Sequence, residues 1–170
     1  MSLEQQDHAI LLNCPFFKGL TERDIERIYA SGHVRRVETG ELIVLQNEVP
    51  PGLCVGLEGR YVVEIQDAPN LPTARIVNLG PGDGFGELSF FDGKPASARV
   101  RSISPGRVFI IPFDVLRGLM SEDFRIERQV LWNLSEVLAQ RLRATNQGLV
   151  MTRQLLIRTI QVAQGEHVDE

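Results

Sequence analysis

Residues 80–102 read GPGDGFGELSFFDGKPASARVRS, and this stretch decides how the rest of the chain is interpreted. Glycine stands at four alternate positions, Gly80, Gly82, Gly84 and Gly86, where it permits tight turns and close approach of the backbone to a ligand. A short helix that begins after Gly86 would point several N–H groups in one direction, which favours an anion. We therefore predict a small-anion site in residues 80–102, called the cassette below.

Composition is typical of one globular domain with an appendage. The chain has 170 residues, 43% of them hydrophobic, and a formal net charge of −4. The negative charge argues against a protein whose whole surface binds nucleic acid. No apolar run approaches the length of a membrane span, and the N-terminus carries Glu4 and Asp7 without the apolar core of a signal peptide. We expect a cytoplasmic protein with no membrane span.

A β domain is predicted over residues 33–113. Short apolar runs recur there at roughly ten-residue spacing, split by Gly, Pro, Asn and Asp, and indicate about eight strands in a roll, jelly roll or barrel. Residues 1–32 are predicted to form N-terminal helices. Thr21 fits the N-cap of the second helix, with Asp24 in a position that approximates a capping box.

Residues 114–170 are predicted to be helical. From residue 123 to about residue 164 no proline interrupts an apolar stripe spaced by three and four, which predicts one long helix or two in tandem. Gly148 is the interruption, at a cost of about 1 kcal/mol relative to alanine. A small β domain cannot cover the whole stripe, so we expect a homodimer through residues 124–164. The alternative is that the second part folds back onto the β domain.

Catalytic motifs are missing from the sequence. It contains no phosphate-binding P-loop, nucleophile elbow or paired-carboxylate cleft. The histidines, His8, His33 and His167, have no metal-ligand spacing. We expect a protein that is not an enzyme, with no catalytic residue, no metal site and no cofactor.

Several motifs, in order, resemble the cyclic-nucleotide-binding domain family over about residues 12–143. The resemblance implies an eight-stranded β-roll flanked by helices, followed by a long helix that acts as hinge, lid or dimer seam. The motifs are Cys14-Pro15-Phe16-Phe17-Lys18-Gly19-Leu20, Gly40-Glu41-Leu42-Ile43, Gln46-Asn47-Glu48, Leu57-Glu58-Gly59, Gly80-Pro81-Gly82-Asp83 and Phe85-Gly86-Glu87-Leu88.

The same resemblance implies roles within the cassette. Glu87 matches a glutamate that accepts a hydrogen bond from the ribose 2′-hydroxyl, and Ser97 matches the small residue after a phosphate-binding arginine. An alternative role for Glu87 is to cap nearby backbone N–H groups without any nucleotide. The candidate ligand-binding residues are Phe85, Gly86, Glu87, Leu88, Ala96, Ser97, Ala98 and Arg99, and the candidate ligands are cyclic AMP and cyclic GMP.

Alanine at position 96 departs from the family pattern, which has arginine there. Loss of a charge-assisted pair with the phosphate should cost about 2–4 kcal/mol, or roughly 30- to 1000-fold in affinity. Arg99 is three residues further, so on a strand it faces the opposite side. Lys94 lies in the preceding turn and could reach the mouth of the site, although such a side chain is more often solvated. Asn47 replaces a common glycine and tolerates the left-handed conformation.

Three functions are consistent with these features. The first is a stand-alone, dimeric regulatory or sensor module that binds a small anion, such as a cyclic nucleotide, weakly or not at all. The second is a ligand-free scaffold that interacts through its long helix. The third is a fragment of a transcription regulator without its DNA-binding part. About 20 residues follow Gly148, with Arg153 and Arg158 as the only basic side chains, so we expect no direct DNA binding.

Overall fold

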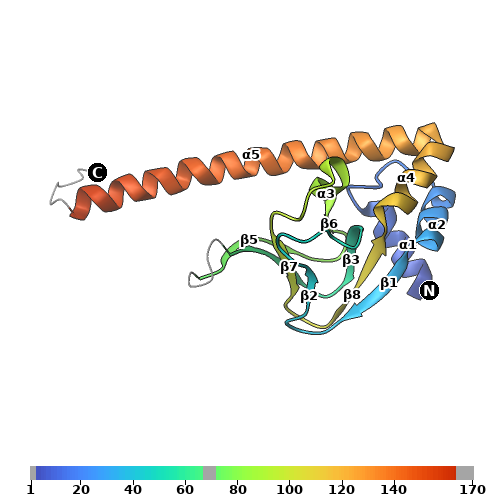
Figure 1. Cartoon of the computed structure of the whole chain (residues 1–170), viewed down its shortest axis with the longest axis horizontal. Helices are drawn as coiled ribbons and strands as arrows, with labels where there is room; N and C mark the ends of the chain where they lie inside the picture. The colour runs from blue at the N-terminus through green and yellow to red at the C-terminus, as the bar shows by residue number, and fades with distance from the viewer. Residues whose placement is uncertain (1–2, 67–71, 164–170) are drawn as a thin grey trace. The chain divides into compact units, whose positions relative to one another are not determined.

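The computed structural model describes residues 3–66 and 72–163, and within them the chain forms two antiparallel four-stranded sheets with flanking helices (Figure 1). The first sheet has the order β1-β8-β3-β6 and the second has the order β2-β7-β4-β5. This confirms the eight-stranded roll followed by a long helix. The strands are β1 His33–Val37, β2 Leu42–Val44, β3 Leu53–Glu58, β4 Tyr61–Ile65, β5 Ala74–Leu79, β6 Gly84–Phe85, β7 Arg99–Ser102 and β8 Gly106–Ile111.

The helices are α1 Leu3–Asn13, α2 Glu22–Ser31, α3 Glu87–Asp92, α4 Phe113–Glu122 and α5 Phe124–Ala163. Helix α2 packs on β8 and α4, and α1 packs on α2 and β3. The long helix is one continuous element that runs through Gly148 without a break. The chain divides into two compact units, residues 1–134 and 135–170, and each is described by itself. Residues 164–170, the end of the predicted helical region, lie outside the described residues.

All eight strands contribute to the core between the two sheets. Strand β8 separates this core from the helical side, because Val108 and Ile110 face the roll whereas Phe109 stacks on Tyr29 of α2, with ring centroids 5.6 Å apart. The alternation is the period of two that a strand imposes on its side chains. The core members are Val37, Ile43, Val44, Cys54, Tyr61, Leu79, Phe85, Ala96, Val100, Val108 and Ile110.

The first turn of α2 has the capping box that the sequence only approximates. The Thr21 hydroxyl accepts a hydrogen bond from the backbone N–H of Asp24, and the Asp24 carboxylate accepts one from the backbone N–H of Thr21. Asp24 closes the box in place of the usual glutamate or glutamine, and it also binds Arg125 of α5 through two N–O distances of 2.8 and 2.6 Å. That second contact fixes the first turn of α5 to α2.

Candidate functional site

The cassette has the predicted glycine-rich turn and short helix. Gly86 adopts the left-handed conformation, with φ of 93°, directly before α3, and Gly93 ends α3 with φ of 67°. A Cβ at Gly86 would lie 2.8 Å from the carbonyl oxygen of Gly52, and one at Gly84 would lie 2.0 Å from the Phe16 ring. Both glycines are therefore required by the turn and by packing, whether or not a ligand binds.

Ala96 lies inside the roll. Its side chain is 8% exposed and belongs to the core cluster, among side chains that include Phe85 and Val100. Its backbone is also occupied, because its N–H donates to the carbonyl of Glu48 and its carbonyl accepts from Asn47 N–H, both at 2.8 Å. Asn47 has φ of 66°, the left-handed conformation expected for it. Position 96 is thus an apolar part of the roll interior, and alanine provides no positive charge for a ligand there.

The other candidate residues differ in exposure. Phe85 and Glu87 are buried, with 3% exposed area each, whereas Leu88 is 50% exposed. Ser97 is exposed and Ala98 is half-buried. Glu87 is the first residue of α3, directly after Gly86. Its negative charge interacts favourably with the positive N-terminal end of the helix dipole. The structure brings Phe85 and Ala96 into one core cluster, and their roles toward a ligand stay predictions.

Arg99 lies on the outer face of the second sheet, opposite to the core-facing Val100. Its guanidinium binds the carboxylate of Glu64 at 3.1 Å and the hydroxyl of Thr73 at 2.9 Å. Arg101 binds the same carboxylate at 2.6 Å. These two guanidinium groups, Arg101 first, hold the pKa of Glu64 below its usual range although burial acts in the other direction. The only cationic residue among the candidates is therefore committed to a structural ion pair.

Replacing Glu64 by glutamine should lower the free energy of unfolding by about 1–2 kcal/mol at neutral pH, because two charge-assisted hydrogen-bonded pairs are lost. The lowered pKa means that this stability is complete above the unfolded value of about 4.3 and is lost as pH falls below it. Denaturant unfolding of the unmodified chain and of Glu64→Gln should be measured at several pH values. The difference between their free energies of unfolding should disappear in acid. Glu26→Gln, an exposed site on α2, is the control and should change stability little at any pH.

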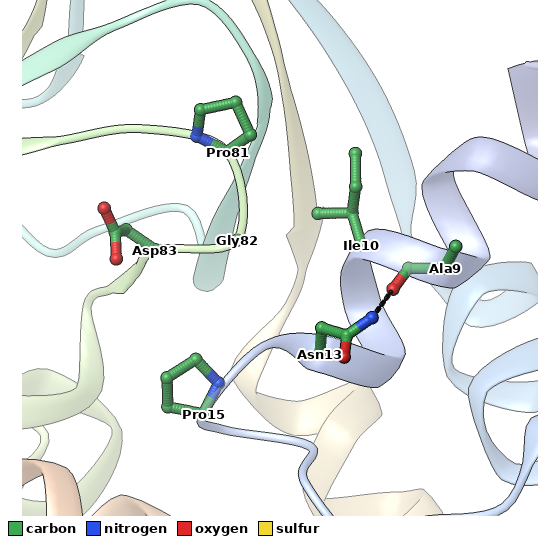
Figure 2. A pocket seen from close by; sticks show the side chains of 7 residues that line it. All are labelled: Ala9, Ile10, Asn13, Pro15, Pro81, Gly82 and Asp83. Atoms are coloured by element: carbon green, nitrogen blue, oxygen red, sulfur yellow. Dashed lines mark hydrogen bonds between the residues drawn. The ribbon is translucent and has the colours of Figure 1, made fainter.

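A groove of about 490 Å³ lies beside the start of the cassette (Figure 2). It separates the C-terminal part of α1 from the turn before β6, and no sequence pattern indicates it. Its two polar side chains serve local structure, since Asn13 Nδ2 donates to the Ala9 carbonyl and Asp83 Oδ2 accepts from Gly80 N–H, each at 2.8 Å. Asp83 would repel an anion. The lining residues are Ala9, Ile10, Asn13, Pro15, Pro81, Gly82 and Asp83.

Arg117 of α4 connects the cassette to the helices that follow the roll. Its guanidinium donates to the backbone carbonyl of Phe90 in α3 and lies over the rings of Phe90 and Phe113, 4.9 and 5.9 Å from their centroids. Asn133 of α5 donates to the carbonyls of Phe16 and Lys18 at 3.1 and 2.8 Å. Sequence reasoning missed both residues, because each contact joins positions distant in the chain.

In residues 3–66 and 72–163, no group of three or more His, Cys, Asp or Glu side chains could hold a metal ion. The same residues include no helix that is both long and apolar enough to cross a membrane.

Comparison with known proteins gives a family match and several relatives. The model of the cyclic nucleotide-binding domain matches residues 34–123, from β1 to the end of α4. The CRP-like cAMP-activated global transcriptional regulator of Mycobacterium tuberculosis is 28% identical over 140 residues, which are 82% of this chain and 60% of that protein. This chain spans 29% to 60% of the length of the first curated relatives that it matches.

Solved structures share the fold. The catabolite activator protein of Thermus thermophilus superposes with a TM-score of 0.70 at 23% identity, over 82% of this chain and 63% of that one. A cyclic nucleotide-binding domain from Methylobacillus flagellatus superposes with a TM-score of 0.75 at 20% identity, over 87% of this chain and 83% of that one. At these identities the structural matches show the fold alone.

Proposed function

The chain belongs to the cyclic nucleotide-binding domain family, and from that premise we propose that it is a regulatory module whose site binds a cyclic nucleotide weakly or not at all. Ala96 carries the proposal. A cyclic phosphate in the roll would meet an apolar wall at this position, and the N–H of Ala96 already donates to Glu48. Without a charged donor, the phosphate keeps only backbone N–H groups to offset its lost hydration.

The contacts of Arg117 support a regulatory role. A ligand that displaced α3 would act on α4 through the bond from Arg117 to the Phe90 carbonyl and through the edge-to-face contact of the Phe90 and Phe113 rings. Helix α4 leads directly into α5 at Asp123. A ligand shifts such an equilibrium only by the difference in its affinity for the two states. A ligand that binds weakly occupies few sites at low concentration, so the shift stays small until the ligand concentration approaches its dissociation constant.

We further propose that the module is a homodimer through α5. Large apolar side chains between residues 142 and 160 are 45–67% exposed. Such a concentration of exposed apolar side chains on one helix is typical of an interaction surface. A second copy is the simplest partner that would cover them. These exposed side chains are Leu142, Leu149, Val150, Met151, Leu155, Leu156, Ile157 and Ile160.

A ligand-free scaffold is the second candidate function. It is favoured by the apolar lining at Ala96 and by the exposed apolar side chains of α5 between residues 142 and 160, because neither feature needs a nucleotide. In that case α5 would provide the interaction surface.

Isothermal titration calorimetry of the full chain with cyclic AMP and cyclic GMP tests the ligand site. We expect no saturation below about 1 mM, equivalent to a binding free energy no better than about −4 kcal/mol. Saturable binding at micromolar concentration would contradict the proposal. Complete absence of heat at millimolar ligand would favour the scaffold over the sensor.

A further inference from the structure

All charged side chains of the second sheet gather on its outer face. The four strands of this sheet contain three arginines, one glutamate and no other charged residue. In the strand register, Glu64 lies opposite Arg99 of β7 and Arg75 of β5. Arg101 is on the same face as Arg99, because only the core-facing Val100 stands between them. We call Arg75, Arg99 and Arg101, together with Glu64, the arginine cluster.

Both carboxylate oxygens of Glu64 are covered by guanidinium groups. Oε1 accepts a hydrogen bond from Arg101 Nη2 at 2.6 Å, and Oε2 accepts from the Nε atoms of Arg99 and Arg101 at 3.1 and 3.2 Å. The Glu64 side chain is only 3% exposed. An anion that approaches this face from solvent therefore meets N–H groups before it meets the carboxylate.

The arginine cluster has more positive charge than its glutamate can offset. One carboxylate balances one of the three guanidinium groups, which leaves two positive charges in a chain whose net charge is −4. Arg75 is 68% exposed, and its Nε lies 3.8 Å from Glu64 Oε1, too far for a hydrogen bond. In residues 3–66 and 72–163, no group accepts a hydrogen bond from Nη1 of Arg99 or of Arg101. All three arginines therefore retain donors for a further acceptor.

We propose that the arginine cluster binds free phosphate as a dianion. A phosphate group with two ionised oxygens carries about −1.5 to −2 near pH 7, which matches the surplus charge of the cluster, whereas a carboxylate carries a single charge. The planar fork of a guanidinium group pairs with two phosphate oxygens at once. Thr73 adds a neutral donor: its hydroxyl oxygen accepts from Arg99 at 2.9 Å, so its own O–H points elsewhere and can donate to the same anion.

This site differs in place and in chemistry from the cyclic-nucleotide site proposed above, and the inference does not rest on that site. Ala96 belongs to the apolar core between the two sheets, whereas the arginine cluster lies on the outer face of the second sheet. Cyclic AMP is a phosphodiester with a single negative charge, so it matches the cluster poorly. Strand β7 begins at Arg99 and ends the cassette, so a bound phosphate would stabilise that strand from outside the roll.

A titration of the isotope-labelled full chain with sodium phosphate at pH 7.5 tests the site. The side-chain Nε–H signals of the three arginines report on it directly in heteronuclear NMR. Sodium chloride is reduced as phosphate is added, so that the ionic strength and the screening of charges stay constant. We expect these signals to shift together and to saturate with a dissociation constant of about 1 mM. Sodium acetate over the same range should cause no saturable shift.

Arg75→Gln is the test variant, because Arg75 is the most exposed member of the cluster and makes no hydrogen bond to Glu64, so the fold should be retained. It should weaken phosphate binding about tenfold. Arg36→Gln is the matched control, since Arg36 is an exposed arginine of β1 in the first sheet and its loss changes the net charge equally. The control should bind phosphate with the affinity of the unmodified chain.

Three results would overturn the inference. Shifts that grow without saturation, at the cluster and at Arg36 alike, would show general ion screening. An equal loss of affinity in both variants would show that net charge, and not this cluster, attracts phosphate. Shifts confined to the backbone amides of Gly86 and Glu87 would place the anion in the cassette instead. None of these results bears on the proposed function, which calorimetry with cyclic AMP and cyclic GMP tests separately.

Discussion

Replacing Ala96 by arginine should raise the affinity for cyclic AMP by about 30- to 1000-fold, which corresponds to about 2–4 kcal/mol from a charge-assisted pair with the phosphate. The rest of the cassette is in place, including Gly86 in the left-handed conformation and a buried Glu87. The variant converts an apolar wall of the roll into the charged donor that the family pattern has at this position.

Arginine at position 96 should also make stability depend on ligand. Ala96 is 8% exposed within the core cluster, so a guanidinium there lacks hydration and a partner until an anion arrives. We expect the ligand-free variant to melt below the unmodified chain, and cyclic AMP to restore the loss. Both quantities can be followed by calorimetry and by thermal melts over a range of nucleotide concentrations.

Ala96→Met is the matched control, because methionine adds a long side chain without charge. It should alter stability through packing and leave nucleotide affinity unchanged. A folded Ala96→Arg protein with the affinity of the unmodified chain would contradict the account of this position. It would mean that the remaining cassette does not form a nucleotide site and would favour the scaffold.

Replacing Asp24 by alanine should lower the free energy of unfolding by about 2–3 kcal/mol, since it removes a helix cap and a bidentate ion pair at once. Asp24 is 3% exposed and binds Thr21 as well as Arg125. Arg125 is about half exposed, so we expect less than the loss from a fully buried pair. For a chain of this length the melting temperature should fall by about 4–12 °C.

The contribution of Asp24 should depend on pH. The Arg125 guanidinium holds the pKa of Asp24 well below its usual range, against the opposing effect of burial. The stability it provides is therefore complete above the unfolded pKa of about 3.9 and is lost as pH falls toward the lower folded value. Asp24→Asn retains the shape of the side chain without the charge, and its effect should lie between those of the unmodified chain and Asp24→Ala. A neutral effect of Asp24→Ala at pH 7 would contradict the importance of this anchor.

The fold was predictable because its signals are local. Turn residues at regular spacing marked the strands, Thr21 and Asp24 marked the start of α2, and the motifs shared with one family gave the order of elements. Asn47 could be assigned the left-handed conformation because asparagine tolerates it. Arg99 faces away from the core position of Ala96 and binds Glu64, but the strand rule is not the reason, because β7 begins at Arg99 and Ala96 lies before it.

The contacts that hold the helices were not predictable in the same way. Asp24 and Arg125 are 101 positions apart, and Asn133 is more than 100 positions from the carbonyls that it binds. No periodicity or local motif links such residues, since only the folded chain brings them together. The groove beside Pro81 was also not predictable, because its walls are α1 and the turn before β6, which are distant in the sequence.

A titration of the isotope-labelled full chain with cyclic AMP, followed by heteronuclear NMR at the backbone amides of Gly86, Glu87 and Ser97, tests the weakness of this site most directly. None of these signals should approach saturation below about 1 mM nucleotide. Saturation of the same signals at micromolar nucleotide would contradict it, because the roll would then bind the phosphate tightly with alanine at position 96.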